Sequence, residues 1–213
     1  MKERPILMSA PMVIATLDGR KTMTRRACKP QPHVDKQMSG GFALNILKRN
    51  YTIDMVSGSI SVNAPHISEC CPYGKVGDRL WLRETFAETD LADGTPAVSY
   101  RAGGCIPVGR RDDKKDYLIT EWALAETPQP EAWHPSIFMP RWASRITLEI
   151  IGIRVERLQD ISEEDCEREL GALHHQLGDG AYREFKTLWE SINGAGSWDI
   201  NPWAWVIKYK RVL

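Results

Sequence analysis

Alternating polar and apolar positions mark several segments of the chain as β-strands. Residues 79–84 carry leucine at every second position, and residues 97–100 form a shorter apolar segment. Residues 145–158 are rich in β-branched side chains and contain a glycine at position 152, which predicts two strands or one bent strand. The clearest alternation is in residues 203–212, WAWVIKYKRV. Because strand side chains point to opposite faces in turn, this period of two predicts half-buried strands.

Apolar residues spaced three to four apart predict three helices. The first begins at Ser9, a favourable N-cap residue, and ends at Gly19. The second begins at Ser162 and has acidic residues in its first turn. The third covers about 180–193 before a glycine. Two faces are expected to point inward: Cys166, Leu170 and Leu173 on the second helix, and Tyr182, Phe185, Leu188, Trp189 and Ile192 on the third.

The remaining stretches have no clear period. Residues 29–75 are predicted to be irregular, with a short hairpin within 51–62, and residues 102–140 are predicted to be loop-like, with a charged run at 110–116. The order of helix, strands, helix, helix and strand predicts an α+β fold, a mixed barrel with flanking helices rather than a dinucleotide-binding sheet. The sequence has no glycine-rich phosphate loop and no zinc-deaminase signature.

The composition is that of an ordinary globular protein. Of the 213 residues, 42% are hydrophobic and 26% are charged. No apolar run approaches the roughly 18 residues that a membrane-spanning helix requires, and the N-terminal segment is too polar for a signal peptide. We therefore expect a cytoplasmic protein without a membrane partner. The sequence does not indicate an oligomeric state.

The cysteines suggest neither a disulfide framework nor a metal site. Their number, five, is odd. Cys70 and Cys71 are adjacent, whereas metal ligands usually have two residues between them. His66 lies four residues before Cys70, so a metal site is conceivable, but buried or idle thiols are the simpler interpretation. We predict no metal and no cofactor.

Zero net charge conceals two segments of opposite sign. Residues 1–50 contain ten Lys/Arg and three Asp/Glu, a net charge of +7, while residues 158–200 contain three and ten, a net charge of −7. A chain of zero net charge is not a general nucleic-acid-coating protein, but a local basic patch can hold one phosphate or one strand. The simpler interpretation is that the two segments pair or are solvated.

The densest polar cluster lies between Gly19 and Arg26 and contains four cations. Neighbouring arginines disfavour the ammonium form of Lys21, and a lysine so tuned can act as a base at neutral pH. A threonine hydroxyl within its reach, that of Thr24, can then serve as a nucleophile or orient a water molecule. A solvated basic turn, or a phosphate-docking loop without chemistry, remains the alternative.

Other residues have both a functional and a structural interpretation. Arg83 can clamp a phosphate or carboxylate, but an arginine beside Glu84 on a strand usually forms an ion pair. Glu169 lies beside the apolar stripe of its helix and either reaches a cleft or lies on the surface. Trp81 and the other tryptophans can stack on bases, although most such rings are core residues.

Gly19, Lys21 and Arg26 fit the G-x-K-x-x-x-x-R signature of ASCH domains, which are similar to PUA RNA-binding barrels. The run G-R-K-T-x-T-x-R resembles that of the small bacterial N4-acetylcytidine amidohydrolases in this superfamily. The resemblance implies a catalytic lysine, threonine and glutamate. By motif the first two are Lys21 and Thr24, and the third is Glu169, in the helix after residues 158–163.

The whole chain also resembles phage- and prophage-encoded ASCH proteins, through residues 71–85, 139–146 and 189–203. This resemblance implies one PUA-like domain over residues 1–213, with insertions near 28–75 and 102–143, and a host cytoplasm if a phage encodes it.

The expected function is hydrolysis of an N-acylated pyrimidine nucleoside or base. The partner is then a nucleoside or RNA, and the alternatives are a non-catalytic RNA-binding module and a metal-independent ribonuclease. The expected substrate-binding residues are Gly19, Trp81, Arg83, Glu84 and Arg26.

Overall fold

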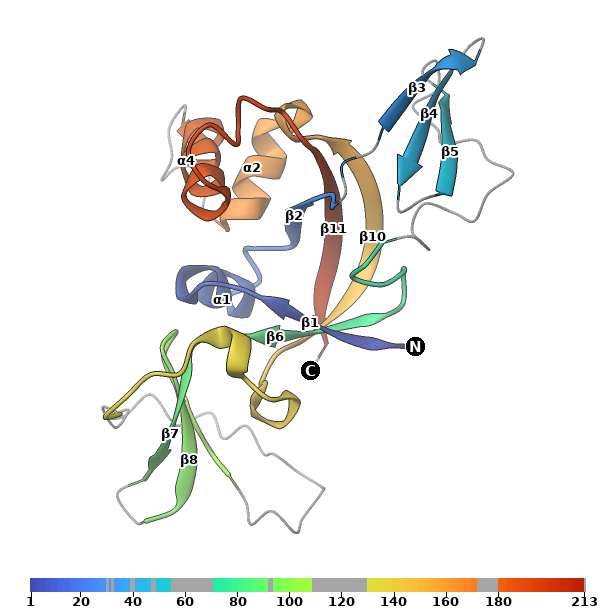
Figure 1. Ribbon diagram of the computed structural model, residues 1–213. Helices are drawn as coiled ribbons and strands as arrows, with labels where there is room; N and C mark the ends of the chain where they lie inside the picture. The colour runs from blue at the N-terminus through green and yellow to red at the C-terminus, as the bar shows by residue number, and fades with distance from the viewer. Residues whose placement is uncertain are drawn as a thin grey trace.

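The computed structural model describes residues 1–29, 31, 33–38, 41–46, 49–54, 71–91, 94–108, 130–171 and 180–212, and of residues 33–54 the backbone alone. Its main element is a five-stranded sheet, on whose concave side helices lie (Figure 1). The strands, in spatial order, are β1 (Glu3–Leu7), β6 (Arg79–Arg83), β10 (Thr147–Arg157), β11 (Trp203–Val212) and β2 (Met23–Ala27).

Two long antiparallel strands, β10 and β11, form the curved centre of this sheet (Figure 1). Their pairing is interrupted by a bulge between Ile150 and Gly152, which bends β10 without ending it. The glycine in this segment therefore marks one bent strand. The strands predicted at 79–84, 97–100 and 203–212 are confirmed. Strand β1 was not predicted, because its Arg4-Pro5-Ile6 stretch is too short to show a period; it pairs in parallel with β6.

The sheet is open between its edge strands. Among the described residues no strand pairing joins β1 to β2, so the sheet is not closed into a barrel by backbone hydrogen bonds. A side chain links the edges instead, since Arg26 Nη2 of β2 donates a hydrogen bond to the Leu7 carbonyl oxygen at the end of β1, at 2.6 Å. The predicted α+β class is confirmed.

The helices follow their predicted bounds closely. They are α1 (Ala10–Leu17), α2 (Glu163–Leu170) and α4 (Ala181–Asn193). The Ser162 hydroxyl caps α2 by accepting a hydrogen bond from the Asp165 amide. Helices α2 and α4 pack on each other, and the core between them includes Cys166, Phe185, Trp189 and Trp198. The inward orientation expected of Ile192 is wrong, because its side chain is 61% exposed. Leu173 lies outside the described residues.

The irregular structure expected at residues 29–75 is also wrong in part. A three-stranded sheet is formed there by β3 (His33–Met38), β4 (Gly41–Ile46) and β5 (Arg49–Asp54). Gly41 opens β4, which pairs with both β3 and β5. Of the hairpin expected within 51–62, residues 51–54 pair with β4 as part of β5, and residues 55–62 lie outside the described residues.

A third sheet is formed by β7 (Phe86–Asp90), β8 (Pro96–Tyr100) and β9 (Cys105–Pro107), so residues 102–140 are not all loop. The charged run at 110–116 lies outside the described residues. Short 3-10 helices complete the structure: η2 (Ser136–Phe138), η3 (Arg141–Ala143) and η4 (Leu158–Asp160). Among the described residues no helix is both long and apolar enough to cross a membrane.

Candidate functional site

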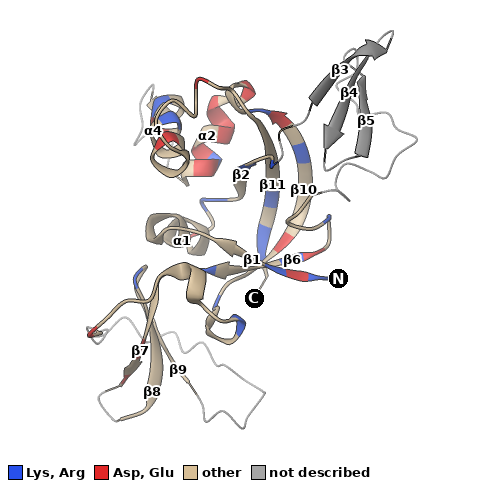
Figure 2. Cartoon of the chain, viewed as in Figure 1, with Lys and Arg blue, Asp and Glu red and all other residues tan. Residues whose placement is uncertain are grey.

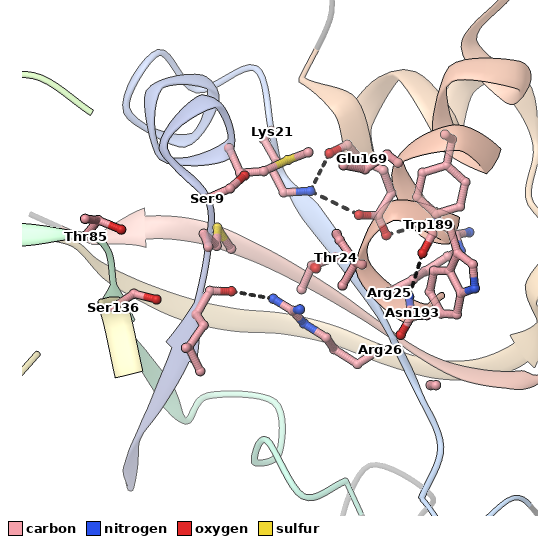
Figure 3. A pocket seen from close by; sticks show the side chains of 17 residues that line it. Ser9, Lys21, Thr24, Arg25, Arg26, Thr85, Ser136, Glu169, Trp189 and Asn193 are labelled. Atoms are coloured by element: carbon pink, nitrogen blue, oxygen red, sulfur yellow. Dashed lines mark hydrogen bonds and ion pairs between the residues drawn. The ribbon is translucent and has the colours of Figure 1, made fainter. Parts of the chain in front are cut away.

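A pocket opens where the end of β1, the start of α1, strand β2 and helices α2 and α4 meet (Figure 3). Its cavity volume of about 430 Å³ lies within the range typical of small-molecule sites. Apolar side chains line two sides of it, from residues 7–12 and from α4. The polar side chains that line it are Ser9, Lys21, Thr24, Arg25, Arg26, Thr85, Ser136, Glu169 and Asn193.

Lys21 and Glu169 meet at the inner end of this pocket. Their side chains are each 4% exposed, and the Lys21 Nζ lies 3.0 Å from Glu169 Oε2. The same ammonium group donates a hydrogen bond to the main-chain carbonyl oxygen of Glu169. Lys21 thus holds both the carboxylate and the C-terminal turn of α2, across 148 residues of sequence. Glu169, which was matched to the family motif over a short stretch, thus lies in contact with Lys21.

The pKa of Lys21 is lowered from its ordinary value of 10.5. Burial is the largest cause, because removal from water penalises the charged form. The Glu169 carboxylate opposes this shift, while Arg26 and Arg25 add to it. The lowered pKa was expected from crowding by arginines, but burial is its main cause. Arg20 does not contribute, since its guanidinium pairs with Asp18 at 2.7 Å.

Thr24 lies on β2 beside this pair, and its hydroxyl group points into the pocket (Figure 3). The residue is 5% exposed. Within the described part of the chain, its hydroxyl makes no hydrogen bond that would occupy it. A buried hydroxyl normally finds a partner. The Thr24 hydroxyl is therefore available to a molecule bound in the pocket.

Arg25 joins three carboxylates behind the pocket. Its side chain is fully buried, and it contacts Glu156 of β10, Asp165 Oδ2 at 2.9 Å and Glu169 Oε1 at 3.4 Å. Partial burial acts to raise the pKa of Asp165, but hydrogen bonds from Arg25 and Arg154 outweigh it, and the pKa lies below the ordinary 3.8. Glu169 is thus held by Lys21 on one oxygen and by Arg25 on the other.

The basic and acidic segments of the sequence pair with each other here. Lys21 and Arg25, from the basic segment, contact Asp165 and Glu169 of the acidic segment. Figure 2 shows α2 with several acidic positions close to the basic stretch that leads into β2. Mutual pairing is therefore found for Lys21 and Arg25 of the basic segment.

Gly171 allows α2 to end against Lys21. Its φ of +64° is left-handed, and an added Cβ would overlap the Ala15 Cβ and lie 3.1 Å from the Lys21 Cβ. The Gly171 carbonyl oxygen also accepts a hydrogen bond from Arg20. A side chain at this position would have to push α2 away from α1 and Lys21.

We expect Gly171→Ala to lower the free energy of unfolding by at least about 2 kcal/mol, because left-handed strain of roughly 1–2 kcal/mol combines with the overlap. Urea denaturation measures this loss. Gly19→Ala is the matched control, since Gly19 has a φ of +72° but open space around it, and it should lose about 1 kcal/mol. Equal losses in the two variants would contradict the close packing at Gly171.

Four of the residues predicted to bind substrate do not line this pocket. Gly19 ends α1, where its left-handed conformation turns the chain toward Lys21. Arg83 stacks over Trp81, with 4.7 Å from Cζ to the ring centroid. Glu84 is 1% exposed and forms two hydrogen bonds of 2.9 Å with Arg145. Burial raises the pKa of Glu84 above 4.5, against the opposing effect of Arg145. The acid of the expected ion pair, Glu84, is thus paired with Arg145 rather than with Arg83.

Several pocket residues were missed because no local pattern marks them. Ser9 was predicted only as a helix cap, yet its side chain makes no capping hydrogen bond and lines the pocket. Thr85 and Ser136 reach the site from segments distant in sequence, and Asn193 from the end of α4. Arg25 was noted only as a neighbour of Lys21. The one available signal was the opposite charge of the two segments.

No group of His, Cys, Asp and Glu side chains that could hold a metal ion occurs in the described ranges. Cys28, Cys71, Cys105 and Cys166 are buried and free of disulfides. Burial raises the pKa of Cys28 and of Cys166 to about 12, so these thiols are unreactive. His66 and Cys70 lie outside the described residues.

Comparison of the chain with protein-family models, with curated proteins and with solved structures finds no match.

Proposed function

We propose that this chain is an ASCH/PUA-like amidohydrolase that removes the acyl group from an N-acylated pyrimidine nucleoside or base, such as N4-acetylcytidine. The observation that carries the proposal is that Lys21, Thr24 and Glu169 line one pocket, with Lys21 and Glu169 in direct contact. A nucleophile, a base and a carboxylate that orients the base are the parts that acyl transfer requires. The curvature of the five-stranded sheet and the helices on its concave side support a PUA-like fold, although the described strands do not close into a barrel.

In the first step the Thr24 Oγ attacks the acyl carbon, and its proton passes to the Lys21 amine. The C–N bond then breaks, the acyl group stays on Thr24 as an ester, and the cytosine amine leaves with a proton returned through Lys21 and Glu169. Water hydrolyses the ester in the second step, giving the free carboxylate and restoring the Thr24 hydroxyl. Arg26 holds the substrate, whereas Arg83, which lies outside the pocket, is assigned no part.

The lowered pKa of Lys21 sets the expected pH dependence. The base must be unprotonated, so kcat/KM should rise with pH and level off below pH 10.5, the ordinary value for lysine. The test follows cytidine release from N4-acetylcytidine by the purified protein at a series of pH values. Absence of turnover at every pH, together with salt-sensitive binding of RNA, would instead assign a non-catalytic RNA-binding module.

A further inference from the structure

The charged groups behind the pocket form a balanced set. Six side chains contact one another in a continuous network, namely Lys21, Arg25 and Arg154 with Glu156, Asp165 and Glu169. With Lys21 in its ammonium form, three positive and three negative charges give a net charge of zero. Arg168 and Glu164, at the exposed rim, add one charge of each sign. In that form the network leaves no carboxylate in excess.

Arg26 adds a positive charge to the pocket that this network does not balance. Its guanidinium lies across the pocket from Glu169, below Thr24 (Figure 3). Among the described residues its protein contact is the Leu7 carbonyl oxygen, at 2.6 Å, and no carboxylate forms an ion pair with it. The buried Nε has no acceptor. A neutral carbonyl oxygen fixes the orientation of the guanidinium but does not neutralise it, so an anion in this pocket would be attracted.

The start of α1 adds the Ser9 hydroxyl to the same pocket. Ser9 precedes the helix and lines the pocket, and its hydroxyl is not used to cap the helix. A helix N-terminus carries partial positive charge and favours anions. The Thr24 hydroxyl, buried and without a partner in the described part of the chain, faces the same space.

The opposite wall is apolar and suits a flat ring. Leu188, Trp189 and Ile192 of α4 line it, together with Phe185. Ile192, a large aliphatic residue, is 61% exposed and lies among the residues that line the pocket. Apolar and aromatic walls with a few directed polar groups are typical of small-molecule sites.

We propose that the ligand of this pocket is a pyrimidine nucleoside monophosphate rather than an uncharged nucleoside. Its phosphate binds Arg26 and the start of α1, while the base lies against α4 with its exocyclic nitrogen toward Lys21 and Thr24. The pyrimidine base, its acyl group and the placement of its exocyclic nitrogen rest on the proposed amidohydrolase function, but binding of the phosphate does not.

The turnover experiment compares N4-acetylcytidine with its 5′-monophosphate, using the wild-type protein and Arg26→Gln. In the wild type we expect kcat/KM to be about tenfold or more higher for the nucleotide, mainly through a lower KM, since a charge-assisted contact is gained. In Arg26→Gln this advantage should disappear. Equal kcat/KM for both substrates would overturn the inference and leave the amidohydrolase function standing. An equal fall in kcat for both substrates in Arg26→Gln would assign Arg26 to the oxyanion instead, and would also overturn it.

A binding experiment decides the inference independently of turnover. Calorimetry with cytidine 5′-monophosphate, cytidine and inorganic phosphate should give about tenfold tighter binding for the nucleotide than for cytidine, weakened by salt and lost in Arg26→Gln. Arg83→Gln is the matched control, because this arginine is also partly buried on a strand but lies outside the pocket. It should bind as the wild type does. Failure of turnover with this binding pattern refutes the amidohydrolase alone, while equal affinities for nucleotide and nucleoside refute the inference alone.

Discussion

Replacement of Lys21 by methionine is expected to lower kcat/KM for N4-acetylcytidine by at least about 10³-fold, within the range contributed by a positioned acid–base group. Methionine keeps the length of the side chain but cannot accept the Thr24 proton. The buried Lys21–Glu169 contact is also lost, so Glu169 keeps Arg25 as its remaining cation. The rate of cytidine release gives kcat at saturating substrate and kcat/KM at limiting substrate, and both should fall.

A second variant separates chemistry from folding. In Thr24→Val the shape is kept and only the hydroxyl is lost, and that hydroxyl makes no hydrogen bond within the described residues. The variant should therefore unfold at nearly the wild-type urea concentration yet lose turnover to a similar extent as Lys21→Met. Thr22→Val, two residues earlier and exposed, is the matched control and should keep full activity. Turnover of Thr24→Val within threefold of the wild type would refute the proposed nucleophile.

Replacement of Arg25 by leucine is expected to lower the free energy of unfolding by about 3–5 kcal/mol, the usual cost of leaving buried charges without a partner. The substitution removes a fully buried guanidinium from among Glu156, Asp165 and Glu169. These carboxylates then repel one another in a medium that screens them poorly. Urea denaturation, monitored by tryptophan fluorescence, measures the loss.

Arg154→Leu is the comparison that tests this explanation. Arg154 contacts two of the same carboxylates, those of Glu156 and Asp165, but its side chain is 38% exposed. At such an exposed position water solvates the carboxylates that lose their ion pair. The free energy of unfolding should therefore fall by about 1 kcal/mol or less. If both variants lost the same stability, burial of Arg25 would not be the reason for its effect.

Local patterns in the sequence were sufficient for most of the helices and strands. The alternation of 203–212 and the residues Ser9 and Ser162 predicted the extent of β11 and the starts of α1 and α2 to within a residue or two. These signals act over a few residues, through side-chain periodicity and, at Ser162, a hydrogen bond to a nearby amide, so they can be read without knowing what packs against them. Most of the strand residues within 33–54 were not predicted, because this stretch shows no clear period of apolar and polar residues.

The sequence by itself determined the α+β class, the start of α1, the extent of the C-terminal strand β11, and Lys21, Thr24 and Glu169 as candidates. Only the tertiary structure decided that Lys21 lies 3.0 Å from Glu169, that Arg25 is engaged while Arg26 has no carboxylate partner in the described residues, and that Trp81, Arg83 and Glu84 do not line the pocket. The physical reason is the distance along the sequence over which each effect acts. Periodicity and capping depend on neighbours in sequence, whereas burial and ion pairing join β2 to α2 across some 140 residues, and one basic run gives no local sign of which arginine meets a carboxylate.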